Sequence, residues 1–262
     1  MNLSVIDADS IIFLCGMRYQ DHSHSGMMNQ VSHFVGDILA QTQATHYLGF
    51  LGGEGNFRHE VAVSRKYKGN RGPKPESIVL WEEPIKNFLV DHWGFVRCHG
   101  IEADDACSIA HGKYSQDYSL TTVGCDHDLQ QLSGWHWNYQ KGSLTKVTPH
   151  QAIYNFYHQL LTGCTGDCVP GCPRVGEVRA TALLSDYPKY EDLDKYQFYL
   201  EDCVKAEYLV RVKEGDWEAY YEEQHTLLKL LDTEQYGFQC PQPIPVPQAQ
   251  EPVLESIDHL FN

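Results

Sequence analysis

Residues 118–132, YSLTTVGCDHDLQQL, lead from a short apolar segment into two aspartates. Residues 118–124 are typical of a buried strand in length, composition and glycine boundary, so Asp126 and Asp128 come where this strand ends. Two like charges at this spacing repel each other unless water, a lysine or a metal ion lies between them. Whether water, a lysine or a metal ion separates the two charges has to be inferred from the rest of the sequence.

Short apolar segments alternate with helical patterns on both sides of this stretch. Pro84 is expected to interrupt one of the helices, and Pro149 to open another. The alternation predicts an α/β fold with a mainly parallel central sheet and flanking helices, in which a functional site forms at the carboxyl ends of the strands. We expect strands at 3–7, 46–52, 94–100 and 118–124, a hairpin at 134–148, and helices at 27–42, 77–93, 102–114 and 149–163.

The second half of the chain has a different pattern. Residues after about 155 are helical in pattern and include a glycine- and proline-rich loop at 163–176, while residues 240–252 are rich in proline and predict an extended tail. We therefore expect an α/β core at 1–150 with a basic segment at about 58–92, a helical region at 151–235 and a tail at 236–262.

Composition narrows the class of protein. The net charge of −15 is typical either of an acidic protein that avoids nucleic acid or of a chain whose carboxylates gather around cations. The sequence has no run of about eighteen apolar residues, so no membrane span is expected. Its first ten residues do not have the pattern of a signal peptide. Nine cysteines, an odd number, favour reduced thiols and a cytoplasmic location.

Acidic residues follow three of the four predicted parallel strands. Each group alone has a simpler interpretation, as a turn or helix cap, as a complement to the helix dipole, or as a solvated turn. Together they converge on one edge of the sheet, where hard divalent cations such as Mg²⁺ or Mn²⁺ would bind them. Two such ions about 4 Å apart can clamp a phosphodiester and generate the attacking hydroxide. The six acids are Asp7, Glu102, Asp104, Asp105, Asp126 and Asp128.

The segment 65–71, RKYKGNR, is basic and contains an aromatic residue. Its four cations can hold phosphates, and Tyr67 can stack on a base. A solvated basic loop is the simpler interpretation of four charges in seven residues. A phosphodiester substrate at a neighbouring metal site would need such a segment, which favours the first interpretation.

Five motifs in order resemble the 5′-nuclease family, which includes bacteriophage 5′→3′ exonucleases, flap endonucleases and the 5′-nuclease domain of bacterial DNA polymerase I. The resemblance runs from about residue 3 to about 185. It implies a PIN-like 5′-nuclease fold with a C-terminal helix–loop–helix subdomain that binds duplex DNA. The motifs are VIDAD, FRHE with YKGNR, GIEADDA, GCDHDLQQL and TGCTGDCVPGCPRVG.

The activity implied by the resemblance is metal-dependent hydrolysis of DNA from the 5′ end, or at 5′ flaps, to 5′-phosphate products. The implied cofactors are two Mg²⁺ or Mn²⁺ ions, with a monovalent cation at the helix–loop–helix. The implied partners are 5′ ends, flaps, gaps and duplex DNA, and also RNA–DNA hybrids. A stand-alone phage enzyme of DNA replication or primer removal, monomeric and in the host cytoplasm, would fit this size.

Site residues carry over from the family only where the motifs match. Lys68, Asp7, Asp105 and Asp126 are implied as catalytic, with Lys68 on the scissile phosphate. The implied substrate-binding residues are Arg58, Tyr67, Arg71, Gly171 and Gly176. The implied metal ligands are Asp7, Glu102, Asp104, Asp105, Asp126, Asp128 and Asp167.

Two departures from the family pattern leave alternatives open. Leu51 stands where the family has an acid at the end of the second strand, with Glu54 as a substitute, and Cys164 replaces the first acid of the loop motif. These changes motivate a non-catalytic, structure-specific DNA-binding protein as one alternative, and a PIN-type ribonuclease is another.

Two further features have simple interpretations. Cysteines at 164, 168 and 172 are interpreted as buried or incidental thiols rather than as a zinc site. His127, between the two aspartates, is expected at the surface.

Overall fold

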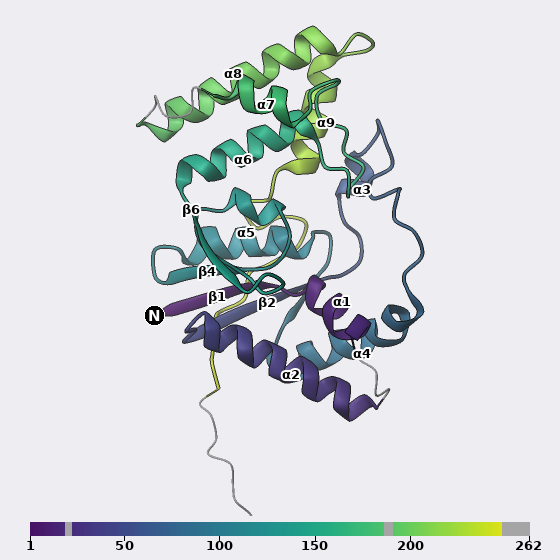
Figure 1. Ribbon diagram of the computed structural model, residues 1–262, viewed down its shortest axis with the longest axis vertical. Coiled ribbons are helices and arrows are strands. Elements are labelled where there is room, and N and C mark those ends of the chain that lie inside the picture. The colour runs from purple at the N-terminus through teal and green to yellow at the C-terminus, as the bar shows by residue number, and fades with distance from the viewer. Residues whose placement is uncertain (19–22, 186–190, 248–262) are drawn as a thin grey trace, which may run out of the picture.

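The computed structural model describes residues 1–18, 23–185 and 191–247. A central sheet carries helices on both faces, and a second helical layer lies beyond one of them (Figure 1). This architecture confirms the predicted α/β class.

The sheet has seven strands, of which six follow the order β3-β2-β1-β4-β5-β6. Neighbours from β3 to β5 pair in parallel, whereas β6 pairs antiparallel with β5 as the predicted hairpin and β7 pairs antiparallel with β2. All parallel strands therefore end at one edge, as predicted. The strands are β1 (Asn2–Asp7), β2 (His46–Gly52), β3 (Val96–Cys98), β4 (Ser119–Val123), β5 (Gly134–Asn138), β6 (Ser143–Val147) and β7 (Ile244–Pro245).

Side chains that alternate along the strands build two cores, one on each face of the sheet. Leu3 and Phe50 pack with α5 (Ala103–Tyr114), while Ile6 and Leu51 pack with the helices of the opposite face. Those helices are α1 (Asp9–Arg18), α2 (His24–Gln41) and α4 (Glu76–Trp93).

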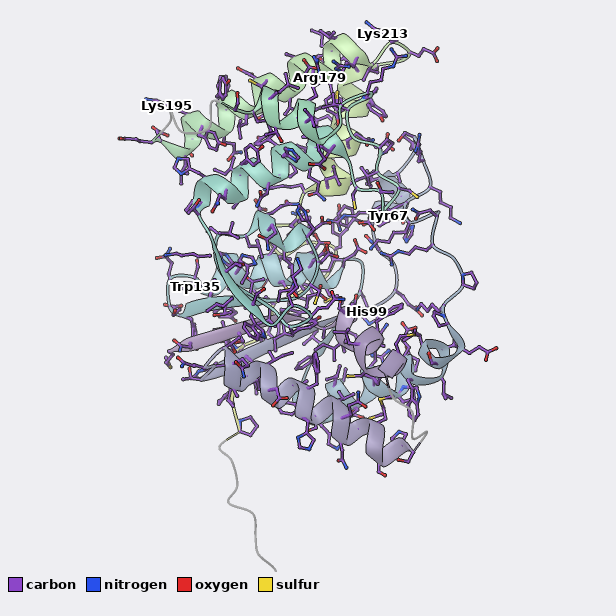
Figure 2. The ribbon with its side chains drawn as sticks, viewed as in Figure 1. Tyr67, His99, Trp135, Arg179, Lys195 and Lys213 are labelled. Atoms are coloured by element: carbon purple, nitrogen blue, oxygen red, sulfur yellow. The ribbon has the colours of Figure 1, made fainter. Side chains whose placement is uncertain are left out.

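The helical layer has a core of its own and lies on the α5 side (Figure 1). Thr148 and Gln151 form a capping box at its first helix, with Pro149 in the first turn. Tyr67, from the basic segment, is part of this core and lies between the two layers (Figure 2). The helices are α6 (Pro149–Thr162), α7 (Glu177–Leu183), α8 (Leu193–Arg211) and α9 (Trp217–Leu228); two short ones are α3 (Arg58–Val61) and η1 (Asp128–Gln131).

Three features differ from the sequence-based expectations. Helix α1 follows β1 directly and was not predicted. Pro84 does not interrupt α4, because buried Ile78 and Trp81 before it and Ile85 after it hold one continuous helix against the sheet. Strand β7 in the tail pairs with β2, which was not predicted, and residues 248–262 of the predicted extended tail lie outside the described residues. Within the described chain, no helix has the length and hydrophobicity needed to span a membrane.

Candidate active site

The predicted acids meet at the carboxyl edge of the sheet. Asp7 is the last residue of β1, Asp126 and Asp128 follow β4, and Glu102 and Asp104 lie at the start of α5. Burial raises the pKa of Asp7 well above its usual value, and the charges of neighbouring acids, including Asp126 and Glu102, raise it further. Acids from three places in the sequence therefore share one electrostatic environment.

Asp104 lies in the same environment. Burial raises its pKa strongly, and the nearby charges of Asp105, Glu102 and Asp126 add to that effect. So many carboxylates in so little solvent are stable only with protons or with cations among them.

Lys68 supplies one cation. Its Nζ forms an ion pair with Glu102 Oε1 and lies 3.6 Å from Asp167 Oδ1. Burial opposes the charge of this amine, but Glu102 and Asp167 prevail and raise the pKa of Lys68. The same contact lowers the pKa of Glu102 despite its burial. Glu102 and Asp167 thus face a positive charge across the site.

The loop at 163–176 is joined to the basic segment at this point. The Lys68 backbone N–H donates to the Asp167 carbonyl (2.8 Å), and the Tyr67 hydroxyl donates to Glu102 Oε2 (2.6 Å) and Asp167 Oδ2 (3.2 Å). Asn70 Nδ2 donates to the Thr165 carbonyl at 2.7 Å. Asp167 therefore reaches the same side chains as Glu102 from the loop at 163–176, and its predicted role as a metal ligand stays a prediction.

Asp128 has a carboxyl group that titrates near neutral pH. Burial, followed by the charge of Asp126, raises its pKa to about 7. Its Oδ1 accepts a hydrogen bond from Gln159 Nε2 of α6 at 2.5 Å, and its N–H donates to Asp126 Oδ1 at 3.0 Å. Asp126 itself is exposed.

A cation held by Asp128 would bind in a pH-dependent way, because the pKa of this carboxyl group is about 7. Below pH 7 Asp128 carries a proton that a bound cation must displace, so Mn²⁺ should bind more tightly as the pH rises through 7. Calorimetric titrations in buffers of different ionisation enthalpy should report proton release at about pH 6 that fades towards about pH 8. Asp128→Asn should reduce this release; an unchanged proton count in that variant would contradict the expectation that Asp128 loses a proton when the cation binds.

Arg58 and Asp105 form a buried pair instead of facing a substrate. Arg58 is 2% exposed and Asp105 is fully buried. The carboxylate accepts hydrogen bonds from Arg58 Nη1 (2.5 Å) and Nη2 (2.8 Å), and from the N–H groups of Glu102 (3.1 Å) and Leu231 (3.1 Å). In this arrangement the protein itself holds both side chains, so the substrate-binding role of Arg58 and the catalytic, metal-ligating role of Asp105 stay predictions.

Two other predicted substrate-binding residues also point inward. Tyr67 is 2% exposed, and the Gly171 N–H donates to Gln224 Oε1 at 3.1 Å in the interior. Neither can meet a nucleotide in this arrangement. Arg71 and Gly176 do face solvent, and Arg71 lies 3.3 Å from Asp167.

A cavity of about 800 Å³ opens between the basic segment and the loop at 163–176. Arg65, Asn70, Arg174 and Gly176 contribute to its wall. The loop that lines this cavity also carries Asp167, whose Oδ1 lies 3.3 Å from Arg71 Nη2 and 3.6 Å from Lys68 Nζ. Positive side chains of the basic segment thus lie beside this acid.

The structure shows the surroundings of Leu51, which stands where the family pattern has an acid, and of Glu54. Leu51 is fully buried among α1, α2 and α4, and Glu54 is exposed. The carboxylate nearest the end of β2 belongs to Asp9, whose Oδ1 accepts the Gly52 N–H at 2.8 Å. Asp9 was not among the predicted site residues, although its position two residues after Asp7 was the available signal.

The cysteines at 164, 168 and 172 and His127 differ in their exposure to solvent. Cys172 is buried, Cys164 and Cys168 are half-buried, and burial raises the pKa of Cys164 to about 11. His127 is exposed, as expected. In the described ranges, no three His, Cys, Asp or Glu side chains already stand in a metal-binding arrangement.

Similarity to known proteins connects this geometry to a chemistry. No protein-family model matches the chain. DNA polymerase I of Bacillus caldotenax is 26% identical over 215 residues, which is 73% of this chain and 24% of that protein. The 5′-3′ exonuclease of Buchnera aphidicola is 27% identical over 158 residues, 54% of each chain. The chain is related to 5′→3′ exonucleases. It spans about a quarter of the DNA polymerase I relative.

Solved structures show that this chain shares its fold with a phage nuclease. A crystal structure of the bacteriophage T5 protein with metal ions has a TM-score of 0.61, 15% identity, and covers 88% of this chain and 90% of that one. A complex of the T5 flap endonuclease with DNA and metal ions has a TM-score of 0.59 and 14% identity, and covers 87% and 99%.

Proposed function

We propose that the chain is a metal-dependent 5′→3′ exonuclease and 5′ flap endonuclease acting on DNA. The observation that carries this proposal is the convergence of acids from β1, β4, α5 and the 163–176 loop beside a basic cavity. Hydrolysis of a phosphodiester needs such a pair of features, because the acids hold cations and the basic side chains hold the substrate.

The donor set fits hard divalent cations. The atoms that the predicted ligands of the cluster offer to a cation are carboxylate oxygens, which suit Mg²⁺ or Mn²⁺. The Lys68 ammonium group, which contacts Glu102 and lies near Asp167, is a stand-in for a cation in the cluster. Asp7, Glu102, Asp104, Asp126, Asp128 and Asp167 would hold the ions, which would supply an activated water and positive charge next to the phosphate. The described residues reach a complete shell only after rearrangement.

The remaining residues would hold and orient the substrate. Lys68 would move from Glu102 to the scissile phosphate and stabilise its developing charge. Arg71, which is 62% exposed, would bind a neighbouring phosphate. The cavity with Arg65, Arg174 and Gly176 would accept duplex backbone, and a monovalent cation on this loop stays a prediction. The T5 enzyme in complex with DNA supports a DNA substrate.

A cleavage assay tests the proposal. DNA labelled at the 5′ end, as duplex, nicked, gapped and flap substrates, is incubated with Mg²⁺, Mn²⁺ or EDTA. We expect metal-dependent release of mononucleotides or short oligonucleotides, and their lengths separate exonuclease from flap endonuclease activity. Matched RNA and RNA–DNA substrates test ribonuclease activity and primer removal. Tight binding to flaps without cleavage in either metal would favour the non-catalytic alternative instead.

A further inference from the structure

We propose that Asp9, the first residue of α1, is a cation ligand that serves the carboxyl end of β2. This inference rests on the proposed function, because it adds a residue to that site. It concerns a position where the strand itself offers no acid, since Leu51 is buried and Gly52 has no side chain.

Asp9 is fixed over the end of β2 by one oxygen only. Its Oδ1 accepts the Gly52 N–H at 2.8 Å, and its own N–H donates to Asp7 Oδ1 at 3.1 Å. Among the described residues no hydrogen-bond donor is assigned to Oδ2, and Asp9 is open to solvent. One carboxylate oxygen thus orients the group while the other remains available.

Gly52 lies next to the Asp9 carboxylate and leaves space for it. Its φ does not lie in the left-handed region, so the backbone does not explain why a glycine stands there. A Cβ at Gly52 would lie 2.7 Å from Asp9 Oδ2, which is closer than such contacts allow. The missing side chain therefore makes room for the Asp9 carboxylate at the place where a side chain of β2 would end.

The surroundings of Asp9 connect it to the acid cluster. Among the acids near Asp7, Asp9 has the largest electrostatic effect on it, and Asp9 also interacts with Glu102 and Lys68. On the other side, Lys86 donates to the Gly52 carbonyl at 3.1 Å and pairs with Glu82 at 3.0 Å. Asp9 thus contacts both Asp7 of β1 and the end of β2, and its charge acts on Glu102 of α5.

A purely structural role is the competing explanation. Asp9 could tie α1 to β2 and complement the helix dipole without binding a cation. Asp9→Asn separates the two roles, because the amide oxygen still accepts the Gly52 N–H while the charge is lost. A structural role predicts unchanged cation binding in this variant.

Mn²⁺ binding without DNA is the test. The full chain is titrated with Mn²⁺, and free Mn²⁺ is followed by electron paramagnetic resonance. Asp9→Asn should weaken binding by about tenfold or more, or remove one class of bound ion. Asp37→Asn, on the far side of α2, should bind as the wild type does. Wild-type affinity for Mn²⁺ in Asp9→Asn would overturn the inference. Loss of Mn²⁺ binding in Glu54→Gln would also overturn it, because Glu54 would then be the ligand near the end of β2.

A double variant that exchanges the two side chains distinguishes loss of a cation ligand from loss of the folded structure. Asp9→Ala combined with Gly52→Asp removes the carboxylate from α1 and grows it from β2 into the vacated space. Recovery of Mn²⁺ binding relative to Asp9→Ala alone supports the inference, and no recovery in a protein that melts like the wild type overturns it. If the wild type itself binds no Mn²⁺, the proposed function fails. If the wild type binds Mn²⁺ and the Asp9 variants bind it equally well, the inference about Asp9 fails and the proposed function stands.

Discussion

Asp126→Asn should reduce the turnover of DNA cleavage by roughly 100- to 1,000-fold, because a lost cation ligand removes several kcal/mol of charge stabilisation in the transition state. Affinity for DNA should change far less. The substitution is mild for the fold, since Asp126 is exposed and its Oδ1 only accepts the Asp128 N–H, which an asparagine oxygen also accepts. Single-turnover cleavage and equilibrium binding to the same flap substrate measure the two quantities separately.

The matched control is Asp37→Asn, which removes the same charge from an exposed position of α2 outside the acid cluster. It should leave both turnover and affinity unchanged. Near-normal turnover in Asp126→Asn, measured beside this control at saturating Mg²⁺, would show that the acid cluster is not the reaction centre.

Arg58→Met should lower the free energy of unfolding by about 3–5 kcal/mol, because it leaves the Asp105 carboxylate buried without its partner. The carbonyls of Leu227 and Lys229, which accept from the same guanidinium at 2.9 and 3.0 Å, would also lose a donor. In a chain of this size the melting temperature should fall by roughly 6–20 °C. Urea unfolding and thermal melting, both at neutral pH, measure the effect.

Arg97→Met provides the comparison, since Arg97 pairs at the surface with Glu83, whose side chain is 62% exposed. Such a pair contributes about 0–1 kcal/mol. If Arg58→Met unfolds no more easily than Arg97→Met but loses affinity for DNA, then Arg58 binds substrate after all and its buried position is not the working one.

The sequence predicted the features that depend on local pattern. Strand ends after Asp7 and Val123 follow from short apolar segments, and their convergence follows from the rule that parallel strands end at one edge. The helix that begins after Glu102 has a capping box with Asp105, which its sequence encodes directly. For these reasons the sheet, most helices and the position of the acids were all predictable.

Features that depend on distant contacts were not predictable. Arg58 looked like a substrate cation because nothing in its local sequence announces that Leu227, Lys229 and Asp105 will surround it. Gln159, which holds Asp128, lies 31 residues away on α6. Family motifs carry residue types forward, but they do not say which side chains are already occupied by the protein.

The contacts of Arg58 also determine when this part of the protein can fold during synthesis. One of its carbonyl acceptors, Leu227, lies 169 residues later in the chain. At typical rates of synthesis, those residues leave the ribosome roughly 10 to 30 seconds after Arg58 does. Until then the guanidinium and the Asp105 carboxylate have no complete surroundings in which to be buried. Strand β7 reaches its place beside β2 later still. The nascent chain therefore cannot assemble the acid cluster in its final form, and the site matures only when nearly all of the described chain has been made.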